Sequence, residues 1–262
     1  MIPIKSPAEQ EAMRAAGRMA GEVLQEACNF VRPGVSTKEI DEFAGECIKA
    51  RGVTSAFLGY RGYPCNICIS VNEEIVHGLA NDRRLQFGDI VSLDCGVKHG
   101  GFIGDTARTI PVGSCSLETQ KLIDVTREAL YDGISRALPG NRVKDISRAV
   151  QNRVEANGFS IVREFVGHGV GRVVHEEPQV PNFVSSGASP KLRAGMTLAI
   201  EPMVNAGGAA IRQLRDGWTV VARDGLPSAH QEHTVLVTEG EPEILTCLEP
   251  RTARTPSPQK VS

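Results

Sequence analysis

The feature that most constrains the fold of this 262-residue chain is an internal repeat. The stretch "PGVSTKEI" begins at Pro33 and "PGNRVKDI" begins at Pro139, and both read Pro-Gly-x-x-x-Lys-acid-Ile. Each motif lies between two helical patterns, and the second pattern of each pair ends at a glycine, Gly52 or Gly158. Glycine just past a helix is the usual left-handed stop. The repeat therefore predicts two similar halves, at about 7–113 and 117–240.

The strands expected after each helix pair also repeat. "LQFGDIVSLD" (85–94) matches "LRAGMTLAIE" (192–201), and "DTARTIPVG" from Asp105 matches "EHTVLVTEG" from Glu232. The second half carries extra residues just before Glu232, around "GGAAIRQLRDGWTVVARDG". Helix pairs followed by antiparallel strands predict an α+β fold in each half.

The repeat makes Asp94 equivalent to Glu201, and Asp105 equivalent to Glu232. If the halves pack about a pseudo-twofold axis, these four carboxylates converge on it. A two-residue turn at positions 99–100 would place Asp94 directly opposite Asp105 on neighbouring strands. Facing aspartates repel each other unless a cation lies between them. Their apolar, glycine-rich surroundings predict burial, where carboxylates need paired cations or metal ions.

Two histidines lie seven residues apart in "VGHGVGRVVHEEP" (166–178), at His168 and His175. The odd spacing places them on opposite faces of an unbroken strand, and the glycines argue against a helix, so a shaped loop or bent strand is expected. His168 joined to the four carboxylates forms a candidate ligand set. Oxygen-rich ligation with one imidazole suits Mn²⁺, Fe²⁺, Co²⁺ or Zn²⁺. Five such ligands suffice for two ions about 3.5–4 Å apart, which leaves His175 for the substrate.

Composition narrows the class of protein. The chain is 41% hydrophobic and 23% charged with a net charge of −2, so no basic field indicates a nucleic-acid partner. No apolar run is long enough to span a membrane, and the first residues lack the apolar core of a signal peptide. Seven cysteines are expected to be reduced thiols in a cytoplasmic protein. The Cys65–Cys68 pair is expected to be structural, because Cys68 lies in a predicted strand.

Several stretches together resemble a known family, the type I methionine aminopeptidases, in the bacterial form without an N-terminal zinc-binding extension. They are "GYRGYPCNICISVNEEIVHG" (59–78), "GDIVSLDCGVKHGGFIGDTART" (88–109), "GHGVGRVVHEEPQVP" (167–181), "AGMTLAIEPM" (194–203) and "EHTVLVTE" (232–239). The resemblance extends from residue 3 to about 247. It implies the pita-bread fold, with two pseudo-symmetric halves whose antiparallel sheet is backed by helices. A single catalytic domain over 1–248 is expected, followed by a disordered tail at 249–262.

The resemblance also implies the metal ligands. Asp94 and Asp105 would bind two divalent ions from the first half, and His168, Glu201 and Glu232 from the second. Asp105 and Glu232 would bridge both ions. Whether the ions are Co, Mn, Fe or Zn stays open. A monovalent-cation site at Asn72 and Ser228 is a further implied feature.

The implied activity is removal of the initiator methionine from nascent proteins when the second residue is small. A hydroxide shared by two metal ions would attack the scissile carbonyl. His77 and His175 would hydrogen-bond the peptide as charge develops, and Glu201 would shuttle the proton to the leaving amine. Taken from the residues alone, a lone histidine such as His77 is more often structural; the resemblance reverses that interpretation.

The resemblance places the methionine side chain among polarizable and aromatic residues. They are Tyr60, Tyr63, Cys68 and Trp218. Two residues differ from the family pattern: Val174 stands where relatives often have Phe, and Phe57 where Cys is common. The two changes either compensate for each other or reshape the pocket.

Three other interpretations remain. A proline peptidase with the same fold usually carries an extra N-terminal domain, for which the first helix, beginning near Pro7, leaves no room. A non-catalytic binding module would be expected to lack some ligands, and all five are present. A plain α+β protein with solvated acidic hairpins would not explain why the carboxylates follow the repeat. The implied partners are nascent chains, the ribosome and a deformylase, with a monomer as the family default.

Overall fold

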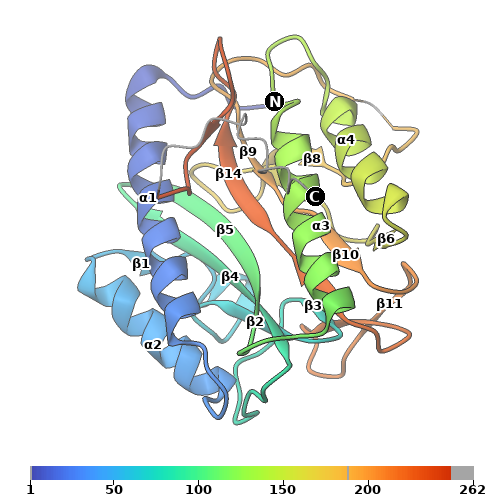
Figure 1. The fold of residues 1–262 in the computed structure, drawn as a ribbon. Helices are drawn as coiled ribbons and strands as arrows, with labels where there is room; N and C mark the ends of the chain where they lie inside the picture. Colours follow the sequence, from blue (N-terminus) through green and yellow to red (C-terminus); the bar gives the residue numbers. More distant parts are fainter. Residues whose placement is uncertain (1, 188, 249–262) are drawn as a thin grey trace, which may run out of the picture.

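The computed structural model describes residues 2–187 and 189–248. The tail expected to be disordered, 249–262, lies outside the described residues. Within them the helices form two pairs, as the repeat predicts (Figure 1). Their bounds are Pro7–Phe30 for α1, Thr37–Ala50 for α2, Leu117–Ile134 for α3 and Val143–Ala156 for α4.

The helices begin and end where local chemistry directs them. Ser6 and Glu9 form a capping box before α1, and Pro7 takes the first helical position, where its missing N–H costs nothing. The second helix of each pair is followed by a glycine with positive φ, 66° at Gly52 and 84° at Gly158. The predicted left-handed stops are therefore confirmed.

A nine-stranded sheet forms the centre of the molecule, with the path β1-β4-β5-β14-β9-β7-β8. Its middle strands are β4 (Ile90–His99), β5 (Phe102–Pro111), β14 (Glu232–Leu236) and β9 (Thr197–Ile200). Because β4 corresponds to β9 and β5 to β14 in the repeat, the order mirrors itself between β5 and β14. The other members are β1 (Thr54–Ser55), β2 (Cys68–Val71), β7 (Gly167–Gly169), β8 (Glu176–Val180) and β15 (Glu243–Ile244). This mirrored order is the pseudo-twofold arrangement that the sequence predicts.

The predicted register of the β4–β5 hairpin is wrong by two residues. Gly96 is the partner of Asp105, and Asp94 is the partner of Ala107. The turn lies at Gly100 and Gly101, whose φ angles are 58° and 82°, and not at positions 99–100. A tight hairpin turn of this type needs positive φ at both central residues, which two glycines meet and a histidine does not. Since the slip is two residues, the two aspartates stay on one face and become diagonal neighbours.

The extra residues of the second half form most of two small sheets. One has the order β13-β10-β6 and the other β11-β12-β3, so β12 pairs with a strand of the first half. Their bounds are Glu74–Val76 for β3, Ser160–Ile161 for β6, Met203–Asn205 for β10, Ile211–Gln213 for β11, Val220–Ala222 for β12 and Ser228–His230 for β13. A short 3₁₀ turn, η1, spans Tyr60–Gly62. The insertion therefore connects the two halves beside the central sheet.

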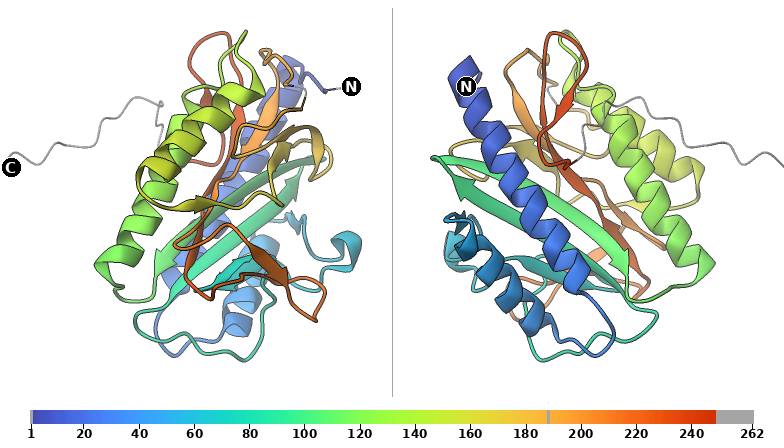
Figure 2. Two further views of the ribbon diagram at one scale, coloured as in Figure 1. Left: turned by 90° about the vertical axis from the view of Figure 1, so that its right-hand side faces the viewer. Right: turned by 60° about the vertical axis from the view of Figure 1, so that its left-hand side comes forward.

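Helices α1 and α3 cover one face of the central sheet (Figures 1 and 2). Gly104 of β5 marks this face, because a Cβ there would clash with the backbone of Ala16 in α1. On β14, the ring of His233 lies near that of Tyr131 in α3, with 6.0 Å between centroids. Side chains alternate along a strand, so Asp105 and Glu232, one residue away from these markers, point to the opposite face. The chemistry-bearing face is thus the one away from the helices.

Candidate metal centre and substrate cavity

Strand pairing brings the acidic side chains of both halves into one row. Ala107 is the partner of Asp94 on one side and of Glu232 on the other. Glu201 directly follows Ile200, which is the partner of His233. The row therefore crosses the boundary between the halves and carries two carboxylates from each.

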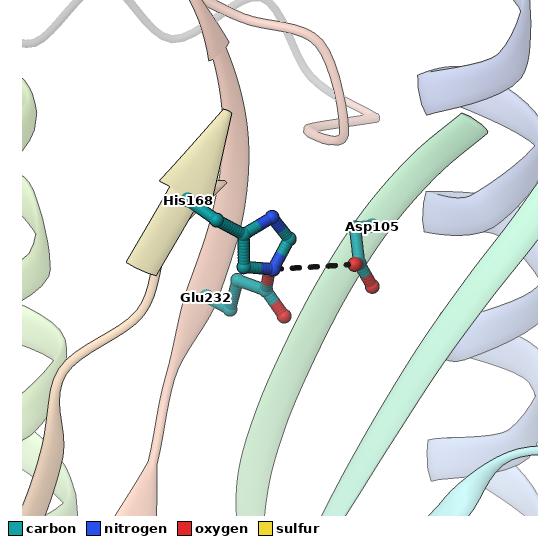
Figure 3. A group of neighbouring side chains, drawn as sticks. All are labelled: Asp105, His168 and Glu232. Atoms are coloured by element: carbon teal, nitrogen blue, oxygen red, sulfur yellow. Dashed lines mark ion pairs between the residues drawn. The ribbon is translucent and has the colours of Figure 1, made fainter. Parts of the chain in front are cut away.

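Asp105, His168 and Glu232 could hold a metal ion. One ligand atom from each lies within 4.8 Å of the others, and all three side chains are buried (Figure 3). His168 Nε2 lies 4.0 Å from Asp105 Oδ2 and 3.3 Å from Glu201 Oε1. The cluster joins three strands from both halves, β5, β7 and β14, which only the folded sheet brings together.

The glycine-rich segment around His168 is a short bent strand, as predicted. β7 lies between β8 and β9, and its register with β8 shifts between His168 and Gly169. A Cβ on Gly167 would clash with the carbonyl of Ala199, so glycine permits this close approach. His168 Nδ1 lies 2.9 Å from the carbonyl oxygen of Gly169 and donates to it, which turns the Nε2 lone pair toward the carboxylates.

The electrostatics of the cluster favour a bound cation. Burial raises the pKa of Asp105 to about 7, and burial followed by the neighbouring carboxylates raises the pKa of Asp94, Glu201 and Glu232 well above their usual values. Asp94 Oδ1 and Asp105 Oδ1 are buried and have no hydrogen-bond partner. In residues 2–187 and 189–248, the ion pairs to these four carboxylates come only from histidines. Carboxylate oxygens without partners beside a neutral imidazole fit divalent ions of the Mn, Fe, Co and Zn type.

A cavity of ≈ 250 Å³ opens over this cluster. Every residue predicted for the metal site and the substrate site lines it. From the metal set these are Asp94, Asp105, His168, Glu201 and Glu232; from the substrate set they are Tyr60, Tyr63, Cys68, His77, His175 and Trp218. Phe57 and Val174 line it as well. The folded chain thus brings together residues that lie up to 175 positions apart.

Two histidines border the cavity beside the cluster. The ring of His175 lies 4.3 Å from that of His168, centroid to centroid, and its Nδ1 lies 2.9 Å from the hydroxyl of Tyr60. His77 has a left-handed backbone, with φ of 59°, and its ring meets Phe165 edge-on at 5.3 Å. Burial, and then His175, lowers the pKa of His77 to about 4. Burial, followed by Arg61, also lowers the pKa of His175. Both imidazoles are therefore neutral at pH 7.

The aromatic end of the cavity is firmly packed. The Tyr63 hydroxyl donates to the carbonyl of Gly78 at 2.8 Å, and its ring meets Trp218 edge-on at 5.1 Å. Cys68 is a buried free thiol on β2, whose strand partner is Asp94, and Cys65 is a buried free thiol as well. A Cβ on Gly96 would lie 2.5 Å from the ring of Phe57, so this ring fills the space above the glycine.

Sequence reasoning missed several cavity residues. They are Arg61, Val76, Phe165, Val166, Met203 and His230. His230 has the strongest chemical character, because its Nε2 is buried without a hydrogen-bond partner and lies 3.6 Å from Glu201 Oε2. Its signal was its position two residues before Glu232, the spacing of one strand face. The other five carry no pattern that separates a cavity wall from an ordinary core residue.

No helix in residues 2–187 and 189–248 is long and apolar enough to cross a membrane.

The backbone carbonyl of Asn72, a residue with φ of 58°, accepts a hydrogen bond from the backbone N–H of Ser228 at 2.9 Å. The structure therefore brings together the two residues that the resemblance assigned to a monovalent cation.

Comparison with known proteins agrees with this geometry. Metallopeptidase family M24 matches residues 11–239. The chain is similar to the methionine aminopeptidase of Clostridium perfringens, with 52% identity over 95% of this chain and 100% of the relative. Its structure is similar to the crystal structure of methionine aminopeptidase from Thermotoga maritima, with a TM-score of 0.91, 45% identity, and coverage of 94% and 99% of the two chains.

A prolidase from Pyrococcus furiosus shares only the fold, with a TM-score of 0.77 and 24% identity, and this chain covers 66% of it. The proline-peptidase alternative therefore has much weaker support than the aminopeptidase interpretation. The chain belongs to metallopeptidase family M24 and, within its pita-bread fold, to the type I methionine aminopeptidases.

Proposed function

We propose that this chain is the metal-dependent hydrolase that removes the N-terminal methionine from proteins whose second residue is small. One observation carries the proposal: a buried Asp105–His168–Glu232 cluster forms one wall of a cavity that also has an aromatic and thiol wall. The first wall fits the chemistry of amide hydrolysis, and the second fits an apolar, polarizable side chain. The methionine aminopeptidases that match along nearly the whole chain support this assignment.

Five residues would hold two divalent ions, chosen among Co, Mn, Fe and Zn. They are Asp94, Asp105, His168, Glu201 and Glu232. The unpartnered oxygens of the two aspartates and the inward-facing Nε2 of His168 support this set. When bound, such ions supply a nucleophile from water at neutral pH and polarise the scissile carbonyl.

The remaining steps belong to the side chains of this chain. A free α-amine that binds at the centre held by these carboxylates would restrict cleavage to the first peptide bond. Glu201 takes the proton from the attacking water and passes it to the leaving amine. His175 and His77 are neutral, so each offers one N–H to the peptide group as charge develops on it.

The pocket for the methionine side chain would lie between Tyr63, Cys68 and Trp218. Tyr63 is held by its bond to Gly78 and by the ring of Trp218, so this wall is rigid. Aromatic edges and sulfur contact a thioether favourably. A small second residue is required because the scissile bond must lie close to the acidic cluster.

The finer assignments are part of the same proposal. The chain would act as a monomeric single catalytic domain on nascent polypeptides near the ribosome, after a deformylase has exposed the amine. Asn72 and Ser228 would bind a monovalent cation, supported by their contact and by the left-handed backbone at Asn72.

A peptide assay on chelator-treated protein tests the proposal. Mn²⁺, Fe²⁺, Co²⁺ or Zn²⁺ is added back, and the substrates are Met-Ala-Ser, Met-Leu-Ser, Ala-Pro-Ala and N-formyl-Met-Ala-Ser. Metal-dependent release of methionine from Met-Ala-Ser alone is the expected result. Cleavage of Ala-Pro-Ala would favour the proline-peptidase alternative, and no turnover with any metal would favour a binding module.

A further inference from the structure

Four histidines line the cavity, and His230 is the one among them that has no role in the proposed reaction. It ends β13, and its side chain is almost fully buried, with 2% of the residue exposed. Its backbone N–H donates to Thr109 Oγ1 at 2.8 Å, and the same hydroxyl lies 2.8 Å from its carbonyl oxygen. β13 also pairs with β10, where Met203 is its partner. The backbone that carries this imidazole is therefore held on both sides.

The imidazole faces one particular atom of the site. His230 Nε2 lies 3.6 Å from Glu201 Oε2, while His168 Nε2 lies 3.3 Å from Glu201 Oε1. The Glu201 carboxylate is thus flanked by two imidazoles, one at each oxygen. His230 Nε2 is fully buried and has no hydrogen-bond partner. A nitrogen that is buried, unpaired and directed at a carboxylate requires an explanation, because leaving it unpaired costs free energy.

The geometry points to His230 as the positioning residue of Glu201: its Nε2–H would donate to Oε2 and leave Oε1, the oxygen nearer His168, available to hold a metal ion. A separation of 3.6 Å is slightly longer than a hydrogen bond, and a small rotation of the carboxylate closes it. His168 has a comparable partner, the carbonyl of Gly169. Outer partners of this kind orient a ligand and typically change metal affinity or activity about 10–100-fold when removed.

The inference rests on the proposed function, because it assumes that Glu201 is a metal ligand. It assigns a role to a residue outside the ligand set and outside the substrate contacts. It also explains why a buried histidine is tolerated beside acidic residues: its N–H meets the carboxylate oxygen that the metal does not use.

Three substitutions separate positioning from packing. H230Q keeps an amide N–H at the reach of Nε2, H230N carries the same amide one bond shorter, and H230L fills the space without a donor. We measure Mn²⁺ affinity by calorimetry, kcat and KM for Met-Ala-Ser, and the Tm of the metal-free protein. H233Q is the matched control, since His233 lies one residue beyond Glu232 and faces α3 on the other side of the sheet.

The expected result is a loss of Mn²⁺ affinity of about 10-fold or more in H230N and H230L, a fall in kcat at nearly constant KM, and recovery in H230Q to within about threefold. The metal-free Tm of H230L should stay within a few degrees of wild type, because Nε2 makes no bond within hydrogen-bond distance there. H233Q should keep wild-type Mn²⁺ affinity.

Two outcomes would overturn the inference. Wild-type Mn²⁺ affinity and kcat in H230N and H230L, with a lowered metal-free Tm, would show a purely structural histidine. Failure of H230Q to recover affinity would contradict the donor role, because an amide N–H at the reach of Nε2 would then not replace the imidazole N–H. If wild-type protein binds no Mn²⁺ and none of the other three ions, the proposed function fails first, and that result is distinct from equal binding by wild type and variants.

Discussion

The hydroxyl of Tyr60 lies 2.9 Å from His175 Nδ1, which ties an aromatic of the cavity rim to a histidine 115 residues later in the chain. Tyr60 was predicted only as a wall of the methionine pocket. The contact gives Tyr60 a second role, because a hydrogen-bond partner on Nδ1 orients the His175 ring and decides how its Nε2 faces the substrate. A hydrogen bond therefore links the cavity rim to a histidine of the proposed reaction.

Removing the Tyr60 hydroxyl should lower kcat/KM. In Y60F the ring remains, but His175 loses a hydrogen bond worth about 1 kcal/mol, so kcat/KM for Met-Ala-Ser should fall about fivefold. Steady-state kinetics checks the effect, with Y131F as control because Tyr131 lies on α3, across the sheet. An unchanged kcat/KM in Y60F would show that His175 is held by other contacts.

Loss of either central carboxylate should abolish turnover. Asp105→Ala or Glu232→Ala removes a ligand expected to serve both ions, so residual activity should be at least about a thousandfold lower at saturating metal, as for other groups that act directly on the reaction. Metal content by elemental analysis accompanies the peptide assay. Normal turnover in either variant would contradict the dinuclear proposal.

The buried carboxylates of the candidate metal centre should destabilise the folded protein when metal is absent. At pH 8, above the folded-state pKa of Asp105 of about 7, Asp105→Asn removes a buried charge whose Oδ1 has no hydrogen-bond partner, so the metal-free variant should melt higher than metal-free wild type although it is inactive. Thermal unfolding in the presence of a chelator measures this. A lower Tm in the variant would mean that the charged carboxylate makes stabilising contacts without metal.

The stability of metal-free protein should fall as pH rises from about 6.5 to 8. The folded-state pKa of Asp105 is raised to about 7, and those of Asp94, Glu201 and Glu232 are raised well above their usual values, so the folded state holds protons that the unfolded state has lost. Their contribution is complete below the unfolded pKa and is lost as pH passes the folded pKa.

Buried histidines act in the opposite direction, but only at lower pH. Burial lowers the pKa of His77 and His168 to about 4, so their contribution is present above about 6.5 and is lost as pH falls. Above pH 6.5 the change of folding stability with pH therefore comes from the carboxylates and not from these histidines. Tm measured at pH 6.5, 7, 7.5 and 8 should decline without metal, and the decline should shrink with Mn²⁺ or in Asp105→Asn. A rising Tm over this window would refute the assignment.

Phe57 and Val174 should prove coupled in substrate binding. Both line the cavity, and the Phe57 ring fills the space above Gly96. F57C alone enlarges the pocket and V174F alone reduces it, so each should raise KM for Met-Ala-Ser severalfold. The double variant should lie closer to wild type than the two single effects predict. Additive changes in KM would show that the two positions act independently.

The sequence by itself determined the helix pairs, their glycine stops, the pseudo-twofold plan and the Asp, Glu and His side chains of the candidate metal centre. These features depend on local rules, namely capping residues, left-handed glycines and the alternation of side chains along a strand. The alternation assigns Asp94 and Asp105 to one face of the sheet. Such rules survive a register error, because a slip of two residues preserves the face. For that reason the predicted acidic face was correct although the predicted pair was not.

Only the tertiary structure decided which atoms meet. The register of the hairpin depended on two consecutive positive φ angles at Gly100 and Gly101, which single-residue alternation does not reveal. The contacts of Tyr60 with His175, and of His230 with Glu201, join separate segments whose positions are set by how β13, β7 and the rim pack against the central sheet. Side-chain partnership between distant segments is a property of packing, and local patterns carry no information about it.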